Sequence, residues 1–145
     1  MVRNTNSVFQ PKNRIDLPIY WTLLFGFELE EKLSEYVNMK YCISCSSGTD
    51  ALLIPLMAKG IGPGDAVITT PFTYIATAEV ISLLGAEPVF VDIYDSTYNM
   101  DPNQIEDAIK HANNKVLNTR DIIPFDLIAL TALYSIICYL ANKHN

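Results

Sequence analysis

The sequence predicts an α/β fold with a mainly parallel sheet and flanking helices. Short apolar stretches alternate with helical segments over residues 41–125. This order is typical of parallel strands joined by right-handed helical crossovers. The run over residues 88–91 is continuously apolar, as expected for a strand buried on both faces of a parallel sheet. The chain has 145 residues, half of them hydrophobic, which is enough for one domain with a core.

The N-terminal region is predicted to be irregular before one amphipathic helix. Residues 1–16 show no pattern, and residues 17–25 form a short apolar and aromatic stretch without a clear role. Apolar residues then recur at helical spacing from Phe27 to Val37, which predicts a helix. The acidic residues near its start most simply form a solvated face, where the helix dipole favours carboxylates. They are Glu28, Glu30 and Glu31.

Strands and helices are predicted to alternate after this helix. The expected strands are Tyr41–Cys45, Ala66–Thr69, Glu87–Ile93 and Ile122–Phe125, and the expected helices are Gly48–Lys59, Ile75–Leu84 and Asn103–His111. Gly60 and Gly85 end the first two of these helices, and Pro102 opens the third. Pro55 lies inside the helix Gly48–Lys59, where it should kink the helix or cost about 3 kcal/mol.

The C-terminal stretch Leu127–Ala141 is almost wholly apolar. Its 15 residues fall short of the roughly 20 that a helix needs to span a bilayer. A buried helix is therefore favoured over a membrane anchor. Membrane attachment stays open as an alternative, which recovery of the chain in a membrane fraction would support.

Composition excludes some partners. The formal net charge of −6 argues against a nucleic-acid partner, because binding a phosphate backbone needs a basic surface. The three cysteines give an odd count without a disulfide framework, which suits a reducing compartment. Residues 1–14 hold no apolar core of a signal peptide. These observations predict a cytoplasmic protein.

The most informative segment is the polar turn Ser46-Ser47-Gly48-Thr49 between a predicted strand and a predicted helix. The first turn of a helix has N–H groups without intrahelical partners and a partial positive charge. Hydroxyl groups stand beside those N–H groups here, so the turn suits an anion such as a phosphate. The alternative is simple helix capping by Ser47 or Thr49.

Other candidate residues point to structural roles. Cys42 and Cys45 form a C-x-x-C pattern, but the odd spacing on a strand would direct their side chains to opposite faces. His111 and His144 are single histidines near helix ends and are expected at the surface. Asp92 ends a predicted strand, where a turn role is favoured over catalysis. No metal site is predicted.

Six ordered motifs carry a family resemblance. They are Phe27–Leu33, Ser47–Leu52, Gly60–Asp65, Thr70–Ala78, Gly85–Asp92 and Thr97–Pro102. Through them, residues 27–110 resemble the DegT/DnrJ-type sugar aminotransferases, which are fold-type-I enzymes dependent on pyridoxal 5'-phosphate (PLP). The resemblance implies part of the large domain of that fold. Within the family, the chain is most similar to enzymes that aminate UDP-3-keto-N-acetylglucosaminuronate for surface polysaccharides.

The resemblance implies a cofactor site. Gly48, Thr49 and Asp50 match the positions that cradle the PLP phosphate. Tyr74 matches the aromatic position that stacks on the PLP ring, and a flat aromatic face suits a flat ring. The alternative for Tyr74 is ordinary packing in the core.

The resemblance also implies what the sequence does not supply. The family needs a lysine that forms a Schiff base with PLP and an acid that holds the ring nitrogen protonated. Neither has a match, so no catalytic residue is assigned. None of the lysines stands in the family's context, namely those at positions 12, 32, 40, 59, 110, 115 and 143. Ile128 and Ala129 also replace the family's aromatic–glycine pair.

These matches and departures define three expected regions. Residues 1–26 form a shortened N-terminal arm, residues 27–126 the N-terminal part of the large domain, and residues 127–145 a diverged apolar C-terminal helix. The sequence is expected to be truncated relative to the family.

The expected function is that of the N-terminal portion of a PLP-dependent aminotransferase, not catalytically competent alone. The family implies a keto-sugar nucleotide as substrate, glutamate as amino donor and a homodimer. The alternative is a non-catalytic relic, or an interaction module that docks on a full-length homologue. Whether the chain is an enzyme stays open at this point.

Overall fold

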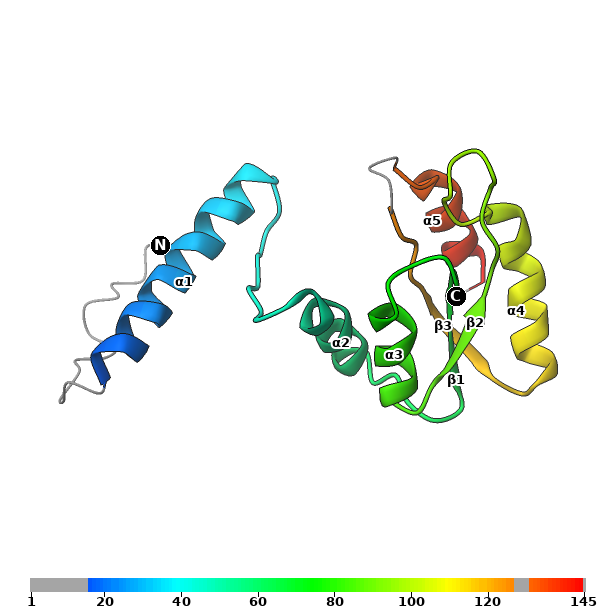
Figure 1. Cartoon of the computed structure of the whole chain (residues 1–145), viewed down its shortest axis with the longest axis horizontal. Helices are drawn as coiled ribbons and strands as arrows, with labels where there is room; N and C mark the ends of the chain where they lie inside the picture. The colour runs from blue at the N-terminus through cyan, green and yellow to red at the C-terminus, as the bar shows by residue number, and fades with distance from the viewer. Residues whose placement is uncertain (1–15, 127–130, 145) are drawn as a thin grey trace. The chain divides into compact units, whose positions relative to one another are not determined.

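The computed structural model describes residues 16–126 and 131–144, with side chains described from residue 25 onward (Figure 1). The chain divides between Ser46 and Ser47 into two compact units. Each unit is described below by itself.

The first unit is built on a single long helix, α1 (Asp16–Tyr36). It begins eleven residues before the helix that the sequence predicts at Phe27, so the stretch 17–25, to which the sequence assigned no clear role, is helical. Pro18 does not prevent this early start, because it lies in the first turn, where its missing N–H is not needed. The large apolar residues described on α1 are exposed, Phe25, Phe27, Leu29 and Leu33 among them.

The predicted strand Tyr41–Cys45 is wrong, because these residues have no regular structure. No described segment of this unit offers a strand for them to pair with. The Glu30 side chain instead accepts hydrogen bonds from this segment. The Ser44 backbone N–H and the Ser44 hydroxyl both donate to Glu30 Oε1, at 2.7 Å each. Glu30 is therefore more than a member of a solvated face, and these hydrogen bonds lower its pKa.

The second unit confirms the α/β class. A three-stranded parallel sheet has the order β2-β1-β3, and its strands are β1 (Asp65–Thr69), β2 (Glu87–Phe90) and β3 (Asn118–Ile122). The helices are α2 (Gly48–Ala58), α3 (Ala76–Leu83), α4 (Ile105–Asn114) and α5 (Tyr134–Lys143), with a short 3-10 helix, η2 (Pro102–Gln104), directly before α4. The helix predicted over Asn103–His111 thus opens as 3-10 and continues as α.

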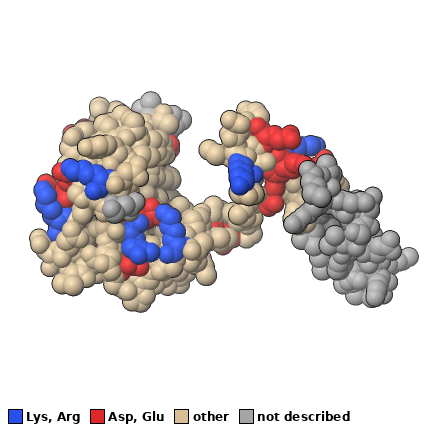
Figure 2. All heavy atoms as spheres, turned by 180° about the vertical axis from the view of Figure 1, so that it is seen from behind, with Lys and Arg blue, Asp and Glu red and all other residues tan. Residues whose placement is uncertain are grey.

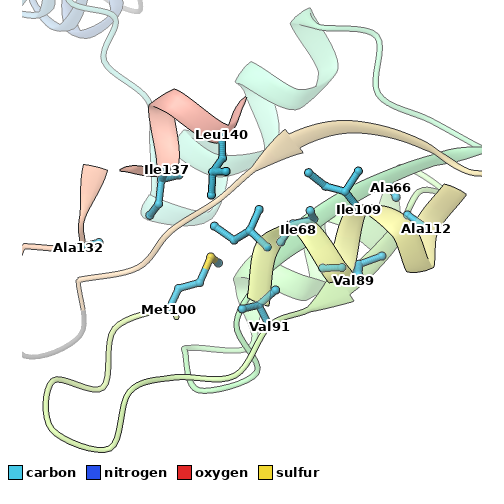
Figure 3. Packing of buried hydrophobic residues seen from close by; sticks show 12 residues of the cluster. Ala66, Ile68, Val89, Val91, Met100, Ile109, Ala112, Ala132, Ile137 and Leu140 are labelled. Atoms are coloured by element: carbon cyan, nitrogen blue, oxygen red, sulfur yellow. The ribbon is translucent and has the colours of Figure 1, made fainter. Parts of the chain in front are cut away.

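Helices pack on both faces of this sheet. Val67 on the central strand joins the core formed with α2 and α3, whereas Ala66 and Ile68 join the core formed with α4 and α5. Successive side chains of a strand point to opposite faces, which explains the division. Figure 3 shows Ile68 and Met100 converging with residues of α4 and α5. The sheet is thus packed from both sides at its central strand, but the prediction that residues 88–91 are buried on both faces is wrong for β2, because Val89 is buried and Phe90 is 50% exposed.

The last strand lies earlier than the sequence predicts. We expected a strand over Ile122–Phe125, but β3 spans Asn118–Ile122. The pairing with β1 sets this position, since Ile68 is opposite Ile122 and the Ile123 N–H donates to the Ile68 carbonyl at 2.8 Å. Pro124 has no N–H to extend the ladder. The polar residues at the start of β3 conceal the strand in the sequence.

The helix α2 is continuous through Pro55. The carbonyl of Pro55 accepts from the Lys59 N–H at 3.0 Å, so the last turn is closed. The proline therefore does not end the helix. The expected energetic cost of this residue stays a prediction.

The apolar C-terminal segment forms a shorter helix than predicted. Residues 127–130 of the predicted helix lie outside the described residues, and α5 begins only at Tyr134. Asp126 organises the turn before it, accepting from the Ala132 N–H at 2.7 Å and from the Tyr134 hydroxyl at 3.0 Å. Ile137 and Leu140 are buried against the sheet, as expected for a buried helix. Among the described helices, none combines the length and apolar character needed to cross a membrane.

Candidate functional site

The N-terminus of α2 is capped by a serine. Ser47 has an extended backbone, and its Oγ accepts a hydrogen bond from the Asp50 N–H at 3.1 Å. The Ser47 hydroxyl also lies 3.0 Å from Asp50 Oδ2, to which it donates. The Ser47 carbonyl accepts from the Ala51 N–H at 3.1 Å. The capping predicted for Ser47 is thus confirmed, and this cap fixes the start of the helix.

Two N–H groups of the same turn have no hydrogen-bond partner in the described part of the chain, those of Gly48 and Thr49. Both residues are exposed. A Cβ built on Gly48 would meet no atom within 4 Å, so the space beside it is open. The Asp50 N–H is engaged by Ser47, and the Asp50 carboxylate adds a negative charge to the first turn. An anion at this turn therefore has the Gly48 and Thr49 N–H groups and the Thr49 hydroxyl available to it.

Tyr74 lies in the segment that leaves the C-terminal end of β1 and enters α3. Its side chain is 71% exposed, so the alternative of ordinary core packing is wrong. The ligands of open α/β sheets bind at the carboxyl ends of the strands, and Tyr74 is at such an end. The helices α2 and α3 contribute to one core on the same face of the sheet, through Leu56 and Val80 among others. The helix that starts at Gly48 and the helix that follows Tyr74 therefore cover the same face of the sheet.

Two aromatic residues beside Tyr74 were not singled out from the sequence. The rings of Phe72 and Tyr98 stack with centroids 5.5 Å apart and planes inclined by 23°. The Phe72 N–H donates to Thr70 Oγ1 at 3.2 Å. Phe72 is two residues before Tyr74 in the same motif, and this proximity is a sequence signal that could have identified Phe72. Tyr98 lies in the motif Thr97–Pro102, but that motif assigns it no role, and only the fold brings its ring to Phe72.

The remaining candidates keep structural roles. Asp92 Oδ1 accepts from the Ile93 N–H at 2.8 Å, and its carbonyl accepts from the Asp101 N–H at 2.9 Å, in agreement with a turn role. His111 and His144 are exposed, as predicted. Because Tyr41–Cys45 is not a strand, the argument that placed Cys42 and Cys45 on opposite strand faces does not apply. Both are free thiols, Cys42 half-buried and Cys45 exposed.

The lysines of the described chain are engaged in contacts within their own units. Five form ion pairs with carboxylates: Lys32 with Glu28, Lys59 with Asp121, Lys110 with Asp107, Lys115 with Glu87 and Lys143 with Glu106. Lys40 lies over the ring of Tyr41, 5.0 Å from its centroid. Figure 2 shows basic and acidic side chains adjoining one another on the surface. Exposed ion pairs of this kind are screened by water and salt, so the pairs place the lysines more than they stabilise the fold.

A parallel sheet with helices on both faces, a helix N-terminus with available N–H groups and an exposed aromatic residue after a strand are typical of an α/β domain that binds a flat, anionic ligand. A family model matches residues 26–145, that of the DegT/DnrJ/EryC1/StrS aminotransferase family. The chain therefore belongs to this family. The match includes the apolar C-terminal segment, which the sequence indicates to be diverged family sequence.

Curated relatives include two enzymes that act on UDP-sugars. The chain is 47% identical to the UDP-2-acetamido-2-deoxy-3-oxo-D-glucuronate aminotransferase of Pseudomonas aeruginosa, over 96% of this chain and 39% of the relative. It is 44% identical to the UDP-N-acetyl-3-dehydro-alpha-D-glucosamine 3-aminotransferase of Acidithiobacillus ferrooxidans, over 82% of this chain and 31% of the relative. The chain thus spans less than two fifths of the length of these relatives.

Solved structures confirm the fold. A DegT/DnrJ/EryC1/StrS aminotransferase from Brucella abortus matches with a TM-score of 0.78 and 48% identity, over 81% of this chain and 32% of that one. A sugar aminotransferase of Streptococcus pneumoniae, described as putative, matches in its PMP form with a TM-score of 0.73 and 36% identity, over 81% of this chain and 28% of that one. The same protein is also known in a PLP form. Cofactor binding is thus a property of the family.

Proposed function

We propose that residues 27–126 form the N-terminal part of the large domain of a PLP-dependent nucleotide-sugar aminotransferase. In this proposal, residues 1–26 are a shortened arm and residues 127–145 a diverged helix of the same domain. The segment would hold the cofactor's phosphate and one face of its ring. The observation that carries the proposal is the capped N-terminus of α2, where two N–H groups and a hydroxyl are available to an anion.

The residues present fit the phosphate of PLP. The open space at Gly48 lets a ligand approach the backbone closely. The Gly48 and Thr49 N–H groups and the Thr49 hydroxyl are donors, and the helix dipole adds a favourable field. The Asp50 carboxylate repels an anion, but its hydrogen bond from the Ser47 hydroxyl disperses part of its charge. Asp50 would therefore contribute through the order that its hydrogen bonds with Ser47 give the turn.

Tyr74 would contribute an aromatic face. Its exposed ring stands at the end of β1 and can cover one side of a flat ligand ring. PLP, when bound, supplies an electron sink that makes transamination possible. The chain's own residues would bind the phosphate, orient the ring and exclude water from one of its faces.

We further propose that the chemical step uses residues outside those described here. The lysines of the second unit, Lys59, Lys110, Lys115 and Lys143, are held in ion pairs with carboxylates. Asp92, the acid nearest the end of β2, binds backbone N–H groups of its own turn. The segment would thus be a cofactor-holding part, not catalytically competent alone.

The relatives suggest the substrates. Both UDP-sugar enzymes carry the keto group in the names of their substrates. We propose a keto-sugar nucleotide as the acceptor and glutamate as the amino donor, in the synthesis of surface polysaccharide. We also propose a homodimer in the cytoplasm. The free thiols of Cys42, Cys45 and Cys138 suit a reducing compartment.

A second candidate function rests on exposed apolar side chains. Tyr139 on α5 is 64% exposed and Met57 on α2 is 58% exposed. Such surface favours association, so the chain could instead dock on a full-length homologue without catalysis. Light scattering of the purified chain, alone and mixed with such a homologue, distinguishes the two. A mixed complex without cofactor binding supports docking, whereas a chain that stays monomeric and separate removes it.

The cofactor proposal is tested by titrating the purified chain with PLP and following cofactor absorbance. Thr49→Val keeps the side-chain shape and removes the hydroxyl. We expect it to weaken PLP binding by about tenfold, because a hydrogen bond to a charged group contributes about 1.5–3 kcal/mol. Inorganic phosphate should compete with PLP in the unmodified chain.

A matched pair of variants tests the aromatic face. Tyr74→Ala should weaken PLP binding, and Tyr74→Phe should preserve it, because stacking needs the ring and not the hydroxyl. Absence of saturable PLP binding by the unmodified chain would remove the proposal for this segment. Equal binding by Thr49→Val and the unmodified chain would remove the role of α2.

A further inference from the structure

Tyr98 has an unusual backbone. Its φ is 58°, in the left-handed region that residues with a side chain other than Asn or Asp seldom adopt. The resemblance and the family matches assign nothing to this residue. Strain of this kind persists only where the surrounding structure over-determines it, and it gathers at functional places.

The loop that holds Tyr98 is closed by several backbone contacts. Ile93 and Met100 form an antiparallel bridge at its base. Inside the loop, the Tyr94 N–H donates to the Asn99 carbonyl at 3.0 Å, and the Tyr98 N–H donates to the Tyr94 carbonyl at 2.8 Å. Met100 is buried in the core. The loop is therefore anchored to the sheet, and its conformation places the Tyr98 ring.

That ring lies on Phe72, with 5.5 Å between the centroids. Phe72 is two residues before Tyr74 in the short segment 71–75, which joins β1 to α3 and has no regular structure before residue 75. Within this segment, the described ring contact is the one between Phe72 and Tyr98. Thr73 Oγ1 is buried without a hydrogen-bond partner, so it does not fix the segment. The segment has other described contacts, the hydrogen bonds from the Phe72 N–H to Thr70 Oγ1 and from the Thr77 N–H to the Tyr74 carbonyl, both at 3.2 Å. The stacked pair adds the side-chain contact that connects the segment to the anchored loop.

We propose that Tyr98 is a positioning residue for cofactor binding. By stacking on Phe72, it holds residues 71–75 in the conformation that presents the Tyr74 ring to a flat aromatic ligand. The proposal rests on the proposed function, since it assigns to Tyr98 an effect on the ring face and not on the phosphate turn at α2. The strain at Tyr98 persists because the ring must reach Phe72 from this loop.

Three substitutions separate the ring from the strain. Tyr98→Phe keeps the ring and is the matched control. Tyr98→Ala removes the ring. Tyr98→Gly removes the ring and relieves the strain, because glycine adopts positive φ without penalty, so this variant folds even where Tyr98→Ala does not.

Two measurements are made on the unmodified chain and on each variant. The first is hydrogen exchange at the backbone amides of residues 72–75, without PLP. The second is the Kd for PLP compared with that for inorganic phosphate. We expect Tyr98→Ala and Tyr98→Gly to speed exchange and to weaken PLP binding by about two- to tenfold, the range that a stacked aromatic pair contributes. Phosphate binding should stay unchanged, and Tyr98→Phe should match the unmodified chain.

Unchanged exchange at residues 72–75 in Tyr98→Gly would overturn the proposal whether or not PLP binds. An equal loss of phosphate and PLP affinity would also overturn it, because the effect would then be general. A chain that fails to bind PLP but shows faster exchange in Tyr98→Gly would remove the proposed function and leave the positioning contact in place. The two failures are therefore distinguishable.

Discussion

Replacing Pro55 by alanine should stabilise the second unit. Pro55 lies in α2 with three helical residues after it, and its side chain is exposed. An alanine would restore the N–H that can donate to the Ala51 carbonyl, four residues earlier, and would remove the contact of the proline ring with that carbonyl. Little packing is lost, because the residue is at the surface.

The magnitude follows from the position. Proline in a helix interior is about 3 kcal/mol less favourable than alanine. Only three residues of the 11-residue helix follow Pro55. This last part of the helix can relax and so relieve part of the cost. We therefore expect a gain of about 2 kcal/mol in the free energy of unfolding, which moves the urea midpoint by about 1 M for a slope of about 2 kcal/mol per molar.

The assay is urea unfolding followed by circular dichroism. Tryptophan fluorescence is unsuitable, because the single tryptophan, Trp21, lies in α1 of the other unit. Pro55→Gly is the control. It restores the N–H but is about 1 kcal/mol less favourable than alanine in a helix, so its midpoint should fall between the two. A midpoint for Pro55→Ala at or below that of the unmodified chain, with the same slope, would refute the reasoning.

Three further predictions concern the cap, the core and acid stability. Ser47→Ala should cost about 1 kcal/mol of stability through loss of the helix cap, whereas Ser47→Asn should keep it, and equal urea midpoints for the two would contradict the capping role. Ile81→Ala should lower the free energy of unfolding by about 2–5 kcal/mol, because Ile81 is fully buried. The control Leu83→Ala on the same helix changes a side chain that is 71% exposed, so it should change stability by less than about 0.5 kcal/mol. Partial burial opposes ionisation of Asp101, but hydrogen bonds from Asn103, Gln104 and Tyr94 outweigh it and lower its pKa. A depressed pKa stabilises the fold above the unfolded value of about 3.9, and this contribution is lost as the pH falls through the folded pKa. Asp101→Asn keeps an acceptor for the Asn103 N–H, so urea midpoints measured from pH 6 to 2 should fall less steeply for it than for the unmodified chain.

Part of the fold could be predicted because the sequence encodes it locally. The apolar run at residues 88–91 predicts a parallel strand, and β2 lies there, although only Val89 of this strand is buried and Phe90 is 50% exposed. Gly60 and Gly85 have φ of 69° and 80° and follow the ends of α2 and α3, as helix-ending glycines do. The apolar run and the helix-ending glycines depend only on residues nearby in the sequence. They can therefore be recognised without the tertiary structure.

The misplaced elements depend on distant partners. The polar start of β3 gives no strand pattern, and its position is set by pairing with β1. Residues 41–45 have the apolar composition of a strand, but they lack a partner strand among the described residues of their unit and pair with Glu30 instead. Composition indicates whether a segment can form a strand, whereas a partner strand decides whether it forms one.

The candidate site divides in the same way. Ser47, Gly48 and Thr49 could be found from the sequence alone, because a helix cap and its donors lie within one turn. The sequence could also propose Tyr74 through the family motif, but only the fold leaves its ring exposed. The stack of Tyr98 on Phe72 joins residues far apart in the chain, and no local pattern records it.

The sequence by itself determined the α/β class, the family and the polar turn at the start of α2, because these follow from periodicity, order and short motifs. The tertiary structure alone decided where β3 lies, which lysines are engaged in ion pairs and how an anchored loop meets the segment of Tyr74. The physical reason is that a hydrogen-bonded ladder, an ion pair or a ring stack forms between groups that only the folded chain brings within a few ångströms of each other.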